Sequence, residues 1–192
     1  MPTDDKRARI LAAATAVFAS RDFHRVPISE VAQRAGVGKG TLYLYFPTKD
    51  ALREGALQAS LERLANEVDR QAAADVSGEA ALRAIVLTIL RFFWKQQDLL
   101  TVVQRYEARR GRRGADRRHR VLRAIESVLV RHRYGSAGVG RHLSAAFLTG
   151  LARAAILNHG PTDRPEAIAT RIVSLYLHGI EGAVPARRRG AA

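Results

Sequence analysis

The sequence predicts an all-α protein with a small N-terminal head and a larger helical body, about nine helices in all. Apolar residues recur at helical spacing along most of the chain, and no segment alternates apolar and polar residues as a half-buried strand would. Glycine or proline interrupts the helical pattern at intervals. We expect the head over residues 1–50, the body over 51–182 and a flexible tail over 183–192.

The first predicted helix covers residues 4–20. Asp4 and Asp5 lie at its start, where the helix dipole favours negative charge. Its apolar side chains fall on one face, which we expect to form the core of the head: Ile10, Leu11, Ala14, Val17 and Phe18.

Residues 28–46 are predicted to form two short helices joined by a tight turn. Gly36 follows the first helix directly, at the point where a left-handed backbone conformation is needed. The second helix turns one apolar face inward, comprising Leu42, Tyr45 and Phe46, and leaves Lys39, Tyr43 and Leu44 outside. This arrangement is typical of a helix-turn-helix, whose second helix lies in the major groove of DNA.

This stretch resembles the TetR family of transcriptional regulators from about Arg9 to Leu52. The matching positions are 10–14, 18, 31–32, 35–37, 39–43, 45–46 and 49. Leu44 departs from the family, which often has His there, and Gly38 stands where Ser is common. Because both lie on the reading helix, the operator sequence does not follow from the resemblance. Beyond residue 52 the resemblance is one of architecture only.

The resemblance implies that the head binds a double-stranded DNA operator. We expect the DNA-binding residues to be Ser29, Lys39, Gly40, Thr41, Tyr43, Leu44, Tyr45 and Lys49. Among these, Lys39, Thr41, Tyr43 and Lys49 suit the phosphate backbone, whereas Gly40 and Leu44 are expected to face the bases. Lys49 follows Thr48, which can cap the next helix, so Lys49 is expected at a helix N-terminus where it can bind a DNA phosphate. The alternative is that Lys49 is an ordinary solvated lysine. Pro27 replaces the family's usual Ser or Thr cap, so the helix after it is expected to lack a side-chain cap.

The body is predicted to contain six helices, over residues 48–74, 79–97, 98–110, 115–133, 139–158 and 164–182. The helix over 79–97 is apolar around much of its circumference, so we expect it to be central. The resemblance implies that the last two helices form a homodimer interface, with Leu151, Ala155, Ile168, Ile172 and Leu175 as its candidate residues. The alternative is that these faces belong to the core of one subunit.

The resemblance also implies an effector cavity within the body. Its candidate lining residues are Phe92, Phe93, Trp94, Tyr106, Phe147 and Tyr176. We expect a small apolar or aromatic effector, anionic if Arg105 or Arg109 faces the cavity. The alternative is that these aromatic residues are plain core, which is common for aromatic residues at helical spacing.

The net charge of +14, from 32 Lys and Arg against 18 Asp and Glu, favours polyanionic partners. Residues 1–50 contribute little of it, with eight basic and five acidic residues, so charge alone does not locate a DNA site. The stretch 105–123 carries nine arginines. Three interpretations remain open for it: a solvated basic loop and helix start, a site for an anionic ligand or acidic partner, and a second contact with the DNA backbone.

Several kinds of chemistry are not expected. The chain has no cysteine, which excludes disulfides and cysteine-based zinc sites. None of the six histidines pairs with a carboxylate at the spacing of a metal or hydrolytic motif, so we expect no metal site, no cofactor and no enzymatic activity. The charged N-terminus lacks the apolar core of a signal peptide, and no apolar run approaches the length of a membrane span, so a cytoplasmic location is expected.

These observations predict a sequence-specific transcriptional repressor that a small-molecule ligand releases from a palindromic operator. Two alternatives remain: a regulator without a small-molecule inducer, and a nonspecific nucleic-acid-binding protein driven by the positive charge. An enzyme or carrier that merely retains the head is disfavoured because no catalytic motif accompanies it.

Overall fold

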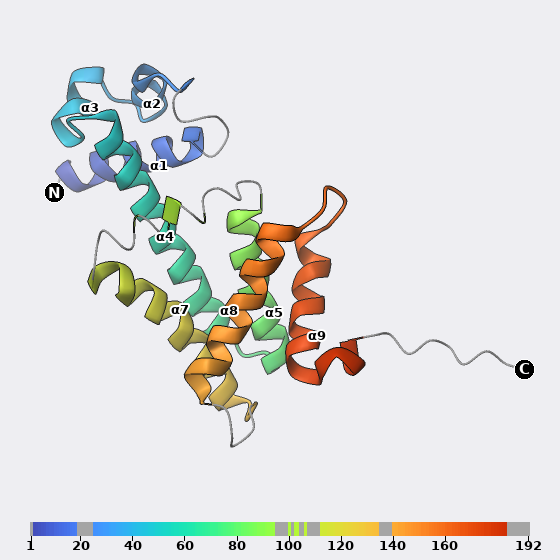
Figure 1. Ribbon diagram of the computed structural model, residues 1–192. Helices are drawn as coiled ribbons and strands as arrows, with labels where there is room; N and C mark the ends of the chain where they lie inside the picture. Colours follow the sequence, from blue (N-terminus) through green and yellow to red (C-terminus); the bar gives the residue numbers. More distant parts are fainter. Residues whose placement is uncertain are drawn as a thin grey trace, which may run out of the picture. The chain divides into compact units, whose positions relative to one another are not determined.

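The computed structural model describes residues 2–18, 25–94, 100, 102–103, 106, 112–134 and 140–183. These residues form eight α-helices and include no strand, which confirms the predicted all-α class (Figure 1). The chain divides into two compact units, the N-terminal unit (Met1–Arg63) and the C-terminal unit (Leu64–Ala192). The division falls inside α4 (Lys49–Ala73), beyond the expected boundary after residue 50, because Leu52 and Ala56 are buried in the core of the N-terminal unit.

Three further helices build the N-terminal unit: α1 (Pro2–Phe18), α2 (Ile28–Arg34) and α3 (Lys39–Tyr45). α1 packs against α2, and α2 packs against α3. Their buried side chains form one shared core, which includes Ile10, Leu11, Val17, Val31, Leu42 and, at the end of α3, Phe46. Phe18 packs against this core, as the apolar pattern of the first helix predicts.

The turn between α2 and α3 has the predicted left-handed residue. Gly36 has φ +64°, which a residue with a Cβ atom adopts only with strain. The backbone N–H of Val37 donates to the carbonyl oxygen of Ala32 at 3.0 Å, which closes the turn, and the Val37 side chain packs on the core. At the other end of α2, Pro27 occupies the N-cap position without a side-chain hydrogen bond, as expected.

The start of α4 is capped as predicted, because the backbone N–H of Ala51 donates to Oγ1 of Thr48 at 3.0 Å.

Gly55 in the same helix explains how closely α4 approaches its neighbours. A Cβ atom at Gly55 would lie 2.8 Å from Cε1 of Phe46 and 3.0 Å from Cδ2 of Leu11. The missing side chain therefore allows α4 to complete the core of the N-terminal unit.

The C-terminal unit is built around α5 (Gly78–Phe93), which packs against α7 (Arg112–Arg131), α8 (Arg141–Asn158) and α9 (Pro165–Ala183). This confirms that the most apolar helix of the body is its central one. Ser77 caps α5 by accepting a hydrogen bond from the Ala80 N–H at 3.3 Å. None of the helices in the described part of the chain has an apolar stretch sufficient to cross a bilayer.

Some expectations differ from the structure or lie outside the described residues. α9 is not the continuous helix expected over 164–182, because Gly179 has φ 73° and ψ −179° and interrupts it. Most of the helix expected over 98–110 and the tail after Ala183 lie outside the described residues. Of the arginine-rich stretch 105–123, the structure describes the side chains of His119 onward and that of Tyr106.

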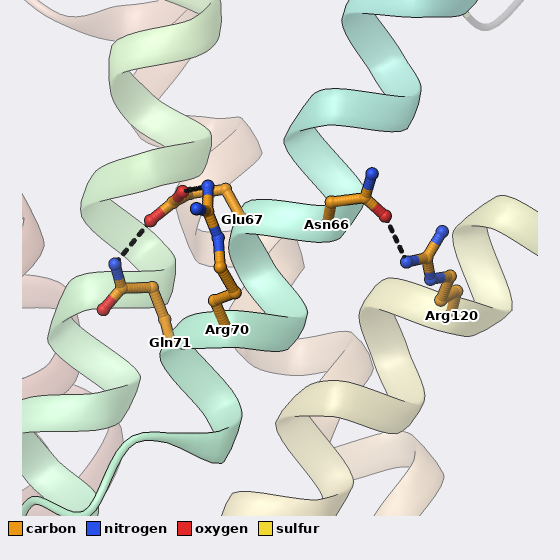
Figure 2. A network of polar contacts seen from close by, with 5 residues as sticks. All are labelled: Asn66, Glu67, Arg70, Gln71 and Arg120. Atoms are coloured by element: carbon orange, nitrogen blue, oxygen red, sulfur yellow. Dashed lines mark hydrogen bonds and ion pairs between the residues drawn. The ribbon is translucent and has the colours of Figure 1, made fainter.

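Two arginines of α7 bind α4 within the C-terminal unit. Arg120 donates from Nε to a carboxylate oxygen of Asp69 at 2.7 Å. Figure 2 shows its second contact, in which Nη2 of Arg120 donates to the side-chain oxygen of Asn66. On the same stretch of α4, Glu67 accepts hydrogen bonds from Arg70 and Gln71. Arg131 donates to the carbonyl oxygens of Ala72 and Ala74 at the end of α4. Arg120 therefore has a structural role in the fold.

Candidate nucleic-acid interface

The two faces of α3 differ sharply in burial. Leu42 is fully buried and Phe46, which ends the helix, is 4% exposed, so both belong to the core. On the opposite side Tyr43 is 40% exposed and Leu44 is 84% exposed, beside the exposed Lys39. The inner face completes the fold of the N-terminal unit, which leaves the outer face available to a partner.

The two glycines at the start of α3 have no role in the packing of the chain. A Cβ atom at Gly40 would meet nothing within 4 Å, and one at Gly38 would meet only Oγ1 of Thr41, at 3.9 Å. The φ angle of Gly38 is −69°, which other residues adopt readily. Glycine inside a helix is destabilising by roughly 0.5–1 kcal/mol relative to alanine. The outer face of α3 therefore lacks side chains at positions where the fold would accept them.

Arg9 of α1 holds the turn that precedes α3. Its Nη2 donates to the carbonyl oxygens of Ala35 at 2.6 Å and Gly36 at 3.0 Å, and its Nε donates to Ala35 at 3.2 Å. A cation at these carbonyls also interacts favourably with the C-terminal end of α2. Sequence reasoning missed this role, because an arginine beside an apolar stripe gives no indication of its partner.

The remaining predicted DNA-binding residues occupy different environments. Ser29 is exposed near the start of α2, and Lys49 is partly buried at the start of α4. Thr41 is partly buried. Tyr45 packs against the core of the N-terminal unit, as its place on the inner face of α3 dictates. The outer face thus brings together Lys39, Gly40, Tyr43 and Leu44, and Tyr45 does not belong to it.

The aromatic residues proposed to line an effector cavity do not share one environment. Phe93 and Tyr106 are buried, whereas Phe92, Trp94 and Tyr176 are partly buried. The rings of Phe92 and Phe93 meet edge to face with centroids 4.8 Å apart. Burial raises the pKa of Tyr176, and a hydrogen bond with Ser144 partly opposes that effect. Phe147 is 57% exposed, so we remove it from the candidate lining.

Trp94 forms a separate contact at the end of α5. Its ring stacks on that of His159, with centroids 3.9 Å apart and an angle of 10° between the planes. Nε2 of His159 also lies 3.2 Å from the carbonyl oxygen of Trp94. This pair joins the end of α5 to the residue that ends α8.

The outer face of α8 carries large apolar side chains that one chain leaves exposed. Leu143, Phe147 and Leu157 are 51%, 57% and 46% exposed. Sequence reasoning missed Leu143 and Leu157 as candidates for an interface. Four of the residues it proposed are partly buried, namely Leu151, Ala155, Ile168 and Leu175. The fifth, Ile172, is 7% exposed and packs inside its own subunit, so it has little surface to offer a partner and we remove it from the candidate set.

Comparison with known proteins identifies the fold and the N-terminal unit. The family model described as "Bacterial regulatory proteins, tetR family" matches residues 10–56. The solved structure of a TetR/AcrR-family regulator from Thermobifida fusca superposes with a TM-score of 0.73 and 20% identity, over 92% of this chain and 98% of that chain. The regulator FadR of Bacillus subtilis, solved in complex with stearoyl-CoA, gives a TM-score of 0.64 and 17% identity, over 90% and 98%. Both similarities show the same all-helical fold.

Two curated relatives are similar in sequence over part of their length. The HTH-type transcriptional activator FasR of Mycolicibacterium smegmatis is 34% identical over 92 residues, which cover 48% of this chain and 42% of FasR. The HTH-type transcriptional repressor KstR of Mycobacterium tuberculosis is 30% identical over 127 residues, which cover 66% of this chain and 58% of KstR. The chain thus spans about half the length of these relatives. The matched segment identifies the helix-turn-helix as that of the TetR family of bacterial regulatory proteins, and the whole chain shares the fold of solved TetR/AcrR-family regulators.

Proposed function

We propose that the chain is a sequence-specific DNA-binding transcriptional regulator that reads its operator with the outer face of α3. The observation that carries the proposal is the division of α3 into a buried face, which the fold needs, and an exposed face that contributes nothing to the core. An exposed helix of this kind fits the major groove, which admits an α-helix.

The proposed contacts sort into two kinds. Lys39, Tyr43 and Lys49, helped by Thr41, bind phosphate oxygens and set the position of the N-terminal unit on the duplex. Gly40 and Leu44 face the base edges. Ser29, exposed near the start of α2, adds a hydroxyl group that suits a neighbouring phosphate.

We further propose that the regulator acts as a homodimer through α8 and α9. A single reading helix contacts only a few base pairs, whereas two copies read two half-sites about one helical turn apart. Leu143, Phe147 and Leu157 form an apolar face along α8, and the small, exposed Gly150 and Ala154 allow another helix to approach closely. Burying this face against the same face of a second copy removes apolar surface from water on both sides.

The proposed effector binds inside the C-terminal unit and releases the DNA. FadR of Bacillus subtilis was solved with stearoyl-CoA, a ligand with a long apolar chain and an anionic head group. The aromatic side chains of α5, with Tyr106 and Tyr176, are suited to such an apolar chain. Residues of α4 belong to both units, so a ligand that favours another arrangement of the C-terminal unit changes the spacing of the two reading helices.

Selection of bound sequences from random duplexes tests the central proposal. We expect one palindromic operator, bound at least about a thousandfold more tightly than unrelated DNA. A protein that binds all sequences alike, with affinity set by salt alone, is the nonspecific nucleic-acid-binding protein of the alternative.

Adding fatty acyl-CoA thioesters of different chain length to the operator complex tests the effector. We expect release of DNA that strengthens with chain length, because each added methylene group buries more apolar surface. If no thioester, free fatty acid or aromatic compound releases the operator, the regulator has no small-molecule inducer of this class. The same experiment in a reporter strain distinguishes a repressor from an activator by the sign of the change in transcription. A cytoplasmic location is part of the same proposal.

A further inference from the structure

Among the large apolar residues that the structure describes, Leu44 has the most exposed side chain, at 84%. Its side chain has no hydrogen-bonding atom, and its removal from water requires an apolar partner. Gly40 lies four residues earlier, and positions separated by four residues share one face of a helix. Leu44 therefore stands beside a position where no side chain projects and where the fold would tolerate one.

The major groove offers very few apolar partners. Its base edges carry hydrogen-bond donors and acceptors, apart from the C5-methyl group of thymine. A leucine pressed against polar edges would displace water without replacing its hydrogen bonds, which is unfavourable. Placed against a C5-methyl group, the same leucine removes apolar surface from water on both sides.

We propose that Leu44 is a specificity-determining residue that reads the C5-methyl group of a pyrimidine in each operator half-site. The inference deepens the proposed DNA-reading function and rests on it. Gly40 contributes by leaving room for the base step next to that methyl group, and the charged Lys39 and the exposed Tyr43 flank the contact on the same helix. The chemistry recognised is a methyl group at C5, which thymine and 5-methylcytosine share.

Deoxyuridine substitution tests the proposal, because deoxyuridine pairs as thymine does and lacks only the C5-methyl group. Each thymine of the selected operator is replaced in turn, in both half-sites, and the affinity of the full-length chain is measured. At one symmetric position we expect the wild type to lose about fourfold per methyl group, and about fifteenfold for the pair. The Leu44→Ala variant is expected to bind the thymine and deoxyuridine operators equally.

Two controls keep the result specific. Leu44→Ala should retain the thermal stability of the wild type, because the side chain it shortens is 84% exposed. Val76→Ala shortens another exposed apolar residue, 46% exposed in the C-terminal unit, and should respond to deoxyuridine as the wild type does. Replacing the critical thymine pair by cytosine and by 5-methylcytosine then distinguishes the sources of the methyl group. Methylation of that cytosine should tighten binding by the wild type and not by Leu44→Ala.

The outcomes separate this proposal from the function on which it rests. A palindromic operator whose affinity is insensitive to deoxyuridine at every position overturns the reading of a methyl group and leaves the DNA-binding function intact. Equal deoxyuridine effects in the wild type and Leu44→Ala also overturn it, as does a change in self-association of Leu44→Ala without a change in base preference. Selection that yields no preferred sequence refutes the proposed function itself.

Discussion

The two units of the chain expose apolar side chains in different ways. In the described part of the N-terminal unit, Tyr43 and Leu44 are the large apolar residues left exposed, side by side on α3 next to Lys39. In the C-terminal unit, Leu143, Phe147 and Leu157 extend along α8 over several turns. A short apolar spot beside a positive charge suits the wall of a DNA groove, whereas a long apolar stripe suits a protein surface. Each unit thus offers the surface that its proposed partner requires.

The arginines of the two units also stabilise different features of the fold. Arg9 binds backbone carbonyls at a turn, which fixes the entry to α3. In the C-terminal unit, Arg120 and Arg91 bind side chains of other helices, Asp69 and Glu166, and Arg131 binds carbonyl oxygens at the end of α4, so that all three join helix to helix. The N-terminal unit therefore depends on one backbone conformation, while the C-terminal unit distributes its polar ties over several contacts.

Breaking the apolar stripe of α8 should have the largest effect. We expect the double substitution Phe147→Arg and Leu157→Arg to yield monomers, because an interface would then bury unpaired charges. Operator affinity should fall by about a hundredfold or more, since one half-site remains for each N-terminal unit. Sedimentation and titration with the operator measure the two effects. Val130→Arg on α7, a residue 50% exposed, is the matched control and should remain dimeric; a dimeric double variant would place the interface elsewhere.

The turn before α3 should be the most sensitive point of the N-terminal unit. Gly36→Ala puts a Cβ atom at φ +64°, 2.8 Å from Nη2 of Arg9. We expect a loss of about 2–4 kcal/mol, from the left-handed conformation and the disturbed hydrogen bonds of Arg9. Hydrogen exchange of amides in α1 to α3 measures it, while amides of the C-terminal unit serve as an internal reference.

Gly40→Ala provides the contrasting control within the same helix. Nothing lies within 4 Å of its added Cβ atom, so the stability of the N-terminal unit should be unchanged or raised by about 1 kcal/mol. Operator affinity should nevertheless fall, because the new methyl group occupies the space proposed for the DNA. A Gly40→Ala variant with full affinity would remove Gly40 from the proposed reading face.

The sequence predicted the N-terminal unit well because short-range rules determine it. Gly36, Thr48 and the inward face of α3 each follow from local spacing and backbone conformation. The partner of Arg9 lies 26 residues away, and no local pattern indicates it. Gly55 was also unexplained by sequence, since its role depends on how near Phe46 and Leu11 lie in space.

The C-terminal unit was predicted less completely because its helices are apolar on more than one side. Ile172 and Phe147 carry similar apolar character in the sequence, yet one is buried within the subunit and the other is exposed. Helical spacing assigns residues to faces and does not state which neighbour covers each face. The interruption at Gly179 likewise has no signal in a pattern that continues on both sides of it.

Lys49→Ala should produce a moderate and uniform effect on DNA binding. Removal of one phosphate contact weakens the affinity for all sequences alike and lowers the salt slope by about one per subunit. Arg171→Ala, which removes an exposed charge from α9, is the control with the same change in net charge. A change in base preference with an unaltered salt slope would show that Lys49 reads bases and does not bind a phosphate.

The smallest expected effect concerns the ion pair between α5 and α9. Nη2 of Arg91 donates to Oε1 of Glu166 at 2.8 Å, and Nε donates to the same oxygen at 3.2 Å. This hydrogen bond from Arg91, together with one from the backbone of Glu166, lowers the pKa of that carboxyl below its ordinary value of 4.5. Because the pKa is lower in the folded chain, the stabilising contribution is present above about pH 4.5 and is lost as the pH falls below it.

Glu166→Gln should therefore lower the melting temperature slightly at pH 7, and this difference should shrink as the pH falls below 4.5 and the wild-type carboxyl takes up a proton. Both side chains are more than half exposed, so added salt should reduce the difference at pH 7. Asp75→Asn, at an exposed position between α4 and α5, is the control for the loss of one carboxylate. A difference that does not shrink as the pH falls would mean that Glu166 stabilises the unit through packing of its side chain. The stability of the C-terminal unit would then depend less on charge than its arginine contacts suggest. In this respect the C-terminal unit would resemble the N-terminal unit.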